Sequence, residues 1–242
     1  MQIMGAVALV TGANRGIGKA FTAELLARGA SKVYAGARDV TTVEVADPRI
    51  VPVALDVTDP ARVTALAEEL GDVTLLVNNA GVAAFSTPLT APLDQVRREI
   101  ETNYLALVGL TQTFAPVLAA NGGGAVVQML SVVSWAAPPA LSTYAASKAA
   151  AWAWTNAARI DLRRQKTEVV GVHVGFVDTE LAAGVVSEKV DPAAVATAAF
   201  DGLEAGEPEV AVDDFSRTVK AGLSDDQNLI YPELERRFLA AG

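Results

Sequence analysis

The feature of this sequence that most constrains its fold is a series of short apolar runs separated by segments with a helical pattern. The runs are continuous and rich in valine, leucine and alanine. Strands of this kind are buried on both faces of a parallel sheet whose crossover connections are helices. We predict strands over residues 7–11, 32–37, 50–55, 73–78, 125–130, 169–174 and 209–212. Helices are expected over about 16–28, 60–70, 93–119, 142–165 and 191–204.

The sequence indicates a single domain. It has 242 residues, and neither an internal repeat nor a linker rich in Pro, Ser or Gly divides it. This length suits a single α/β domain with a large core. We therefore predict one doubly wound (Rossmann) domain over residues 1–242, with a mainly parallel seven-stranded sheet flanked by helices. The Asn-Gly-Gly-Gly run at 121–124 is expected to end a helix and form a turn.

Charge and composition exclude several classes of function. The net charge is −9, of which −6 lies in residues 201–242, with ten acidic and four basic residues. An acidic chain without a basic cluster is unsuited to nucleic acid or to an anionic membrane. With no Cys and only one His, His173, we predict no disulfide and no metal site. The first charge is Arg15 and no run of 18 apolar residues occurs, so a cytoplasmic protein is expected.

A glycine-rich loop follows the first expected strand and leads into a helical pattern. It reads Thr-Gly-Ala-Asn-Arg-Gly-Ile-Gly, with glycines at Gly12, Gly16 and Gly18. Glycines in this context allow a tight turn, approach of the backbone to a pyrophosphate and close packing of helix on strand. A plain glycine-rich turn is the alternative. The loop therefore predicts a dinucleotide site.

Tyr144 and Lys148 lie four residues apart in an expected helix of small residues. This spacing places a phenol and an ammonium group on one helix face. The reference pKa of a phenol is about 10, and a cation within about 4–6 Å can lower it by 1–3 units. The pair could therefore act as a proton donor near neutral pH. The alternative is a surface lysine beside a half-buried tyrosine.

Further motifs occur in a fixed order along the chain. Asp56-Val57 follow the third expected strand, and Asn78-Asn79-Ala80-Gly81 follow the fourth. Asn103 lies in the next helix, and Ser131 stands 13 residues before Tyr144. With the glycine loop and the Tyr-Ala-Ala-Ser-Lys run, this set resembles the short-chain dehydrogenase/reductase family from residue 7 to about 180. Six motifs in order are far more specific than any one of them.

The resemblance implies hydride transfer between a nicotinamide and a carbonyl or alcohol carbon. Tyr144 would give its proton to the carbonyl oxygen, and Lys148 would lower the pKa of Tyr144 and hold the nicotinamide ribose. Ser131 would place the substrate oxygen, and Asn103 would hold a water that links Lys148 to solvent. Ser134, ten residues before Tyr144, is a competing serine. A satisfied amide inside a helix is the alternative for Asn103.

The resemblance also implies a set of cofactor contacts. These are Gly12, Asn14, Arg15, Gly16, Ile17, Gly18, Arg38, Asp56, Val57, Asn79, Ala80, Gly81, Tyr144, Lys148, Val177 and Thr179. Ala37 stands where members that prefer NAD commonly carry Asp, and Arg38 follows it. Two guanidinium groups, from Arg15 and Arg38, would suit the 2′-phosphate of NADP(H). The alternatives are solvated surface arginines, or an Arg38 paired with Asp39.

Two departures from the family pattern stand out. Val174-Gly175 replaces the usual Pro-Gly after the sixth strand, and the C-terminal segment 213–242 is atypical. The second departure weakens any inference about a tetramer contact through the last strand. The expected assembly is a homodimer or homotetramer, with dimerisation through the helices at 93–119 and 142–165.

The expected substrate is a small neutral hydrophobic carbonyl or alcohol compound. Residues 180–190 form a short substrate lid with an apolar surface from Leu181, Ala182, Ala183, Val185 and Val186. The other walls would come from 82–93, with Phe85, and from 132–141, with Trp135, Pro138 and Pro139. Lys189, at the end of the lid, is the one basic residue in these stretches, and a charge buried without a partner is costly. A lid that selects nothing is the alternative.

Three functions fit these observations. The first is an NADPH-dependent reductase that converts a ketone or aldehyde to an alcohol. The second is an NADP-dependent alcohol dehydrogenase that runs in the oxidative direction. The third is a dinucleotide-binding regulator without catalysis, against which the set of Ser131, Tyr144 and Lys148 argues.

Overall fold

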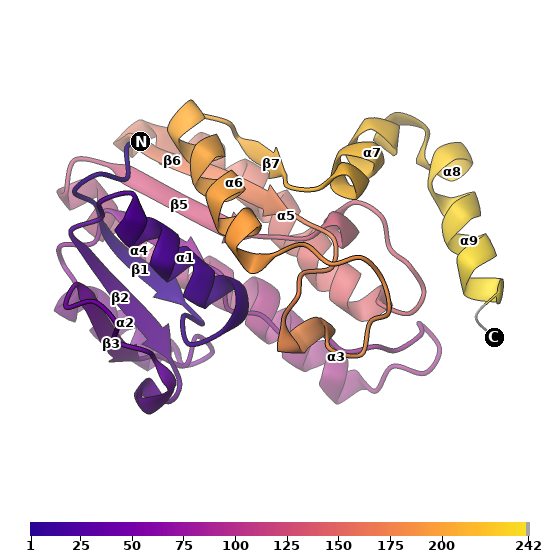
Figure 1. Cartoon of the computed structure of the whole chain (residues 1–242), viewed down its shortest axis with the longest axis horizontal. Coiled ribbons are helices and arrows are strands. Elements are labelled where there is room, and N and C mark those ends of the chain that lie inside the picture. The colour runs from indigo at the N-terminus through magenta and orange to yellow at the C-terminus, as the bar shows by residue number, and fades with distance from the viewer. Residues whose placement is uncertain (241–242) are drawn as a thin grey trace.

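A parallel sheet forms the centre of the computed structural model, which describes residues 1–240. Its seven strands lie in the order β3-β2-β1-β4-β5-β6-β7, and all six neighbouring pairs are parallel (Figure 1). The predicted doubly wound sheet is therefore confirmed. The strands are β1 (Val7–Thr11), β2 (Lys32–Ala37), β3 (Ile50–Ala54), β4 (Leu75–Asn78), β5 (Gly124–Met129), β6 (Thr167–His173) and β7 (Glu209–Ala211).

Helices cover both faces of the sheet (Figure 1). One face carries α1 (Gly16–Ala27) and α6 (Pro192–Ala205), which contact each other through Phe21 and Phe200 with ring centroids 5.4 Å apart. The other face carries α2 (Pro60–Glu69), α4 (Ala106–Ala120) and α5 (Ser142–Leu162). Each layer has its own apolar core. Because both sheet faces are covered, the strands read as unbroken apolar runs.

The long helix expected over 93–119 consists of three parts. They are α3 (Leu93–Ile100), a π-helical turn η2 (Glu101–Leu105) and α4. By length and composition the span Leu93–Ala120 could cross a membrane, with a mean hydropathy of 1.2 in its most apolar stretch. In this structure it packs against β4, β5, α2 and α5. A π-turn widens a helix locally and is often found at functional sites.

The C-terminal segment is helical, which the sequence reading did not predict. It contains α7 (Asp214–Gly222), α8 (Asp226–Leu229) and α9 (Tyr231–Ala240). Figure 1 shows α8 and α9 reaching away from the sheet, at the end of the molecule opposite the N-terminus. The shorter turns are η1 (Val40–Thr42), η3 (Val132–Ser134), η4 (Arg163–Gln165), η5 (Glu180–Ala182) and η6 (Leu223–Asp225).

Candidate active site

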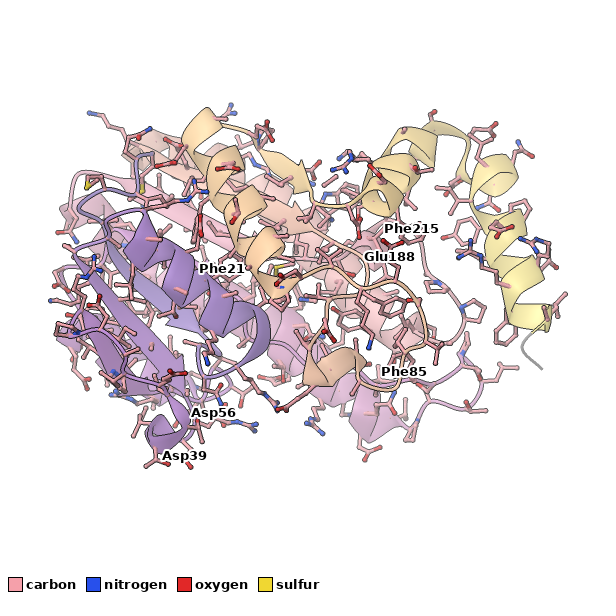
Figure 2. All side chains as sticks on the ribbon, viewed as in Figure 1. Phe21, Asp39, Asp56, Phe85, Glu188 and Phe215 are labelled. Atoms are coloured by element: carbon pink, nitrogen blue, oxygen red, sulfur yellow. The ribbon has the colours of Figure 1, made fainter. Side chains whose placement is uncertain are left out.

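A single large cavity lies at the carboxyl ends of the strands. Its volume is about 2010 Å³, and it extends from the glycine loop to the C-terminal helices. Figure 2 shows Asp39 and Asp56 at one end, beyond β2 and β3, and Phe85, Glu188 and Phe215 toward the other end. Sixteen of the predicted site residues line it, namely Gly12, Asn14, Arg15, Gly16, Ile17, Arg38, Asp56, Val57, Asn79, Ala80, Gly81, Ser131, Tyr144, Lys148, Val177 and Thr179.

The glycine loop is held by the residues that follow β4. The backbone N–H groups of Asn79 and Ala80 both donate to Thr11 Oγ1 at 2.9 Å. The side-chain amide of Asn79 donates to the carbonyls of Thr11 and Gly12 at 2.9 and 3.3 Å. The Asn79 amide is thus engaged with the loop, and helix α1 starts at Gly16 beside the cavity. Its unpaired N–H groups point to where an anion would bind.

Gly18 does not line the cavity, but its lack of a side chain lets α1 pack against the loop. A Cβ atom there would lie 2.0 Å from the Gly12 carbonyl oxygen and 2.7 Å from Asn79 Nδ2. Any other residue would separate the helix from the loop. Gly18 is therefore a packing residue of this site.

The two arginines of the predicted phosphate corner do not converge in this structure. Arg15 forms an ion pair with Glu180 at the start of the segment 180–190. Arg38 is exposed, and among residues 1–240 it has no hydrogen bond or ion pair. The carboxylate of Asp39 accepts from Thr41 N and Thr41 Oγ1 instead of pairing with Arg38. Arg15 is turned toward Glu180 because that carboxylate is within its reach.

The carboxylate of Asp56, which follows β3, accepts hydrogen bonds from a nearby threonine. Its Oδ1 accepts from Thr58 N at 2.9 Å and from Thr58 Oγ1 at 2.7 Å. These bonds lower the pKa of Asp56, and the nearby Arg38 lowers it further. The carboxylate is therefore ionised at neutral pH at the far end of the cavity.

Ser131, Tyr144 and Lys148 lie together at the end of β5. Ser131 caps η3, and its Oγ lies 3.4 Å from both Val133 N and Val174 O. Lys148 is buried and donates from Nζ to Met129 O at 2.8 Å, with Nζ 5.8 Å from the centre of the Tyr144 ring. Ser134 does not line the cavity and accepts from Ser131 N. The structure therefore brings Ser131, and not Ser134, to the phenol.

The predicted effect of Lys148 on Tyr144 is wrong for this structure. Burial raises the pKa of Tyr144 to about 12, although the hydrogen bond with Ser131 opposes this, and the charge of Glu99 adds to the increase. Burial also lowers the pKa of Lys148 to about 8. The prediction considered the charge pair alone, whereas desolvation disfavours the charged form of both groups.

Asn103 lies in the π-turn and is fully used by the protein. Its Oδ1 accepts from Val82 N at 2.8 Å, and its Nδ2 donates to Val82 O at 2.8 Å and to Ser147 Oγ at 2.9 Å. Asn103 and Lys148 also line a separate cavity of about 10 Å³. This volume is at the lower limit for one water molecule. Asn103 thus fixes the loop after β4 and lies beside Lys148.

Glu99, one helical turn before Asn103, was missed by sequence reasoning. Its side chain is 1% exposed, and Oε1 accepts from Ala84 N at 2.8 Å. Oε2 has no hydrogen-bond partner within residues 1–240. The sequence could have revealed Glu99 through its spacing of four from Asn103, because this spacing puts both side chains on the same helix face.

The loop after β6 is tied to the C-terminal helices. Gly175 N donates to Asp213 Oδ2 at 2.9 Å, while Asp213 Oδ1 caps α7 through Ser216 N. Val177 pairs with Val190, which closes the segment 180–190 into a loop. Thr179 lies against Gly16, whose Cβ would be 3.0 Å from Thr179 Cγ2. Asp213 therefore fixes the position where this chain has Val174-Gly175 instead of Pro-Gly.

The substrate end of the cavity differs from the prediction in two respects. Phe85, Pro138, Pro139 and Leu181 line it as expected, but Trp135 is buried away from it, and Ala183, Val185 and Val186 do not line it. The second difference is a wall that sequence reasoning missed, which contains Phe215, Val219, Ile230, Leu234, Arg237 and Phe238. Buried Ser216, Val219 and Gly222 recur every three residues after the cap at Asp213, a spacing that could have revealed α7.

The walls also contain more charge than predicted. Arg98, Lys189, Arg217 and Arg237 all line the cavity. Arg217 is paired with Asp214, and Arg237 is paired with Glu233. In the described part of the chain, no group of three or more His, Cys, Asp or Glu side chains is arranged to hold a metal ion.

Comparisons with known proteins support the family resemblance and the fold. The family model described as short chain dehydrogenase matches residues 6–190. A 1-deoxy-11-beta-hydroxypentalenate dehydrogenase from Streptomyces avermitilis is 34% identical over 204 residues, which cover 78% of this chain and 75% of that protein.

Solved structures give the same result over almost the whole chain. A short chain dehydrogenase from Burkholderia cenocepacia J2315, in complex with NADP, is 37% identical with a TM-score of 0.93, covering 97% of this chain and 99% of that one. A short chain dehydrogenase/reductase from Burkholderia phymatum, in complex with NAD, has a TM-score of 0.83 and covers 95% of this chain and 98% of that one. At 24% identity, the second likeness shows the fold alone.

Proposed function

This chain belongs to the short-chain dehydrogenase family, and we propose that it is an NADPH-dependent carbonyl reductase that converts a ketone or aldehyde to an alcohol. The observation that carries the proposal is that Ser131, Tyr144 and Lys148 line the same cavity as the glycine loop. One cavity can therefore hold a dinucleotide and a carbonyl compound side by side.

The residues of the cavity suit a nicotinamide dinucleotide. Gly12 has a φ of +66°, and a Cβ there would be 3.3 Å from Ala80, so the backbone can approach a pyrophosphate at the start of α1. A Cβ at Gly81 would lie 3.2 Å from Asn103 Oδ1 and 3.7 Å from Lys148 Nζ, so this wall also depends on glycine. Asp56 and Val57 would hold the adenine end, and Val177 and Thr179 would hold the carboxamide end.

The bound nicotinamide would supply the hydride, and the protein would supply the proton. In the proposal Ser131 Oγ hydrogen-bonds the substrate oxygen, and Tyr144 gives its phenolic proton to that oxygen. The high pKa of Tyr144 keeps the phenol protonated at neutral pH. A group that stays protonated can act as a general acid, provided it lies within reach of the oxygen.

Lys148 and Asn103 would support this proton transfer. Lys148, with a pKa of about 8, can exist in both protonation states near neutral pH. It would bind the nicotinamide ribose and return a proton to Tyr144. The cavity of about 10 Å³ beside Asn103 and Lys148 gives a water a place between them, as the proposal requires.

A preference for NADPH over NADH is the part of the proposal that depends on Arg15 and Arg38. Arg38 follows β2 with no carboxylate partner in the described chain, so its guanidinium is available for a 2′-phosphate. Arg15 would exchange Glu180 for the phosphate. The structure from Burkholderia cenocepacia contains NADP, which supports this choice.

The proposed substrates are neutral and hydrophobic, including bulky or aromatic ones. Phe85 and Phe215 are 55% and 48% exposed at the substrate end, so they offer apolar surface to a ligand. Residues 180–190 would form the lid and 213–242 the far wall. We also propose a cytoplasmic location and a homodimer or homotetramer. The direction of reaction would follow the cofactor ratio of the cell.

The experiment that tests this function is NADPH consumption with a panel of carbonyl compounds. The panel contains an aryl ketone, an alkyl ketone, an aldehyde and a 2-oxo acid of similar size, and each alcohol product is tested with NADP⁺. We expect the neutral ketones to have the highest kcat/KM, and Tyr144→Phe to lower kcat by about 10²–10⁴. Binding of NADPH without turnover of any compound would favour a non-catalytic regulator, and a preference for the oxo acid would refute the neutral pocket.

A further inference from the structure

The only histidine of the chain lies directly behind the proposed catalytic serine. His173 ends β6, its side chain is 0% exposed, and its Nδ1 is 3.0 Å from the backbone oxygen of Ser131. A carbonyl oxygen can only accept, so Nδ1 must carry the proton in this hydrogen bond. The hydrogen bond therefore fixes the tautomer of a neutral ring, with Nε2 unprotonated.

Stacking on Trp135 and the hydrogen bond to Ser131 hold the imidazole in place. The Trp135 ring stacks on it with centroids 3.8 Å apart and an interplanar angle of 16°. Glu209 Oε1 lies 3.8 Å from His173 Nε2 and accepts from Trp152 Nε1 at 2.5 Å. Lys220 forms an ion pair with the other oxygen of Glu209. The ring therefore has little freedom to rotate.

These contacts form a continuous connection from the C-terminal segment to the serine. Lys220 belongs to α7, whose residues Val219 and Ala221 line the substrate end of the cavity. Glu209 belongs to β7, which pairs with β6. Lys220 Nζ also lies 4.6 Å from the centre of the Trp135 ring. The connection thus runs from a substrate wall through Lys220, Trp135 and His173 to the backbone of Ser131.

The hydroxyl of Ser131 depends on its backbone for its position. The hydrogen bonds of its Oγ to the backbone, with Val133 N and Val174 O, are long, at 3.4 Å. The bonds to its carbonyl oxygen are shorter, at 3.0 Å from both Ser134 N and His173 Nδ1. The backbone is thus held more tightly than the side chain, and a change at His173 would move both.

We propose that His173 is a positioning residue, which holds Ser131 in line with the phenol of Tyr144 and is itself held by the stacked ring of Trp135, over which Lys220 lies. This inference rests on the proposed function. It assigns a role to the atypical C-terminal segment, because Lys220 contributes to the geometry of the serine without touching the substrate.

The charges that face the imidazole come from three elements. They are Glu209 on β7, Lys220 on α7 and Arg159 on α5. Arg159 belongs to this set because its Nη2 and His173 Nε2 both lie near Gly171. Burial lowers the pKa of His173, and Lys220 lowers it further, whereas Glu209 raises it. The ring is therefore neutral at pH 7, and removal of the Lys220 charge is expected to raise its pKa.

Two variants of nearly equal shape separate the hydrogen bond from packing. His173→Asn places an amide N–H where Nδ1 stands, and His173→Leu fills the same space without a donor. We expect His173→Leu to lower kcat about 10- to 100-fold, because small displacements of an orienting group have costs of this size. We expect His173→Asn to stay within about threefold of wild type. The KM for NADPH should not change in either variant, because the nucleotide residues lie elsewhere.

Thermal unfolding and NADPH binding show whether each variant is folded. Equal kcat in the two folded variants, whether high or low, would overturn the proposal, since packing alone would then explain the result. If His173→Leu does not fold, Lys220→Met keeps the proposal testable, because it removes the cation from the Trp135 ring at a distance from the serine. We expect Lys220→Met to lower kcat severalfold, and an unchanged kcat would overturn the role of this connection.

The single histidine also permits a direct test by NMR, with a chain that carries no histidine tag. Imidazole 15N shifts in the wild type should show the tautomer with the proton on Nδ1, and Lys220→Met should raise the pH at which the ring titrates. The opposite tautomer would overturn the proposal. These spectra do not depend on turnover, so an inactive wild type with the expected spectrum would refute the proposed function and not the hydrogen bond.

Discussion

Substitution of Gly18 by alanine should damage the nucleotide site while leaving the rest of the fold intact. In the middle of the first turn of α1, the new Cβ would lie 2.0 Å from the Gly12 carbonyl oxygen and 2.7 Å from Asn79 Nδ2. Carbon atoms of this kind do not approach closer than 3.0 Å, so the loop must move by about 1 Å. Overpacking of this extent costs about 1–3 kcal/mol.

The movement would also break the clamp that shapes the loop. Asn79 Nδ2 donates to Gly12 O at 3.3 Å, and a further 1 Å would end this hydrogen bond. Alanine recovers about 0.5–1 kcal/mol of helix propensity. We therefore expect a net loss of about 1–2 kcal/mol in unfolding free energy. NADPH binding should weaken tenfold or more, because each 1.4 kcal/mol of lost contact is about tenfold.

Gly109→Ala is the matched control. Gly109 also lies inside a helix, α4, and a Cβ there would meet nothing within 4 Å. This variant should be as stable as wild type or more stable, with unchanged NADPH binding. Urea unfolding and fluorescence titration with NADPH measure both quantities. A Gly18→Ala protein that matches Gly109→Ala in stability and affinity would show that the close approach of helix and loop does not matter.

Three further predictions concern the proposed catalytic and cofactor residues. Tyr144→Phe should lower kcat by about 10²–10⁴ and leave NADPH binding unchanged, and more than a tenth of wild-type turnover would exclude Tyr144 as the acid. Arg38→Asp should reduce the preference for NADPH over NADH by roughly 10- to 150-fold in kcat/KM, and an unchanged ratio would remove Arg38 from the phosphate site. The third concerns Lys148, whose pKa burial lowers to about 8. In the unfolded chain the pKa of a lysine is about 10.4, so between pH 8 and 10 the unfolded chain binds more protons than the folded one. The free energy of unfolding should therefore rise over this range, by about 3 kcal/mol at most. Urea unfolding at pH 7 to 10 measures this, and Lys148→Met should lack the rise.

The sheet was predictable from the sequence because burial on both faces leaves a local signature. All seven strands were expected within about two residues of their observed ends, and the glycine loop was located by its context. Sixteen of the residues that the family resemblance implied line the cavity, and they gather there because the ends of neighbouring parallel strands meet. The strands themselves follow from periodicity and chain order.

Other features depend on contacts between distant parts of the chain. The reading treated Trp135 as a pocket wall, but the tryptophan stacks on His173, from β6. It treated Tyr144 and Lys148 as an isolated pair, but burial raises the pKa of Tyr144 instead of lowering it, and also lowers the pKa of Lys148. The C-terminal helices were missed because α7 and α9 are short and rich in charged residues, so that their small apolar faces gave a weak signal. In each case the missing information is tertiary.

The end of β6 is where these tertiary contacts meet. His173 reaches the Ser131 carbonyl, Val174 accepts from Ser131 Oγ, and Gly175 donates to Asp213. Three consecutive residues therefore connect the proposed catalytic serine, the loop toward Val177 and the start of α7. Because Asp213 accepts from Gly175 N, the residue that caps α7 fixes the strand end where the family often has proline. Changes in the C-terminal segment should thus act on the serine and on kcat, since the glycine loop lies on the other half of the sheet.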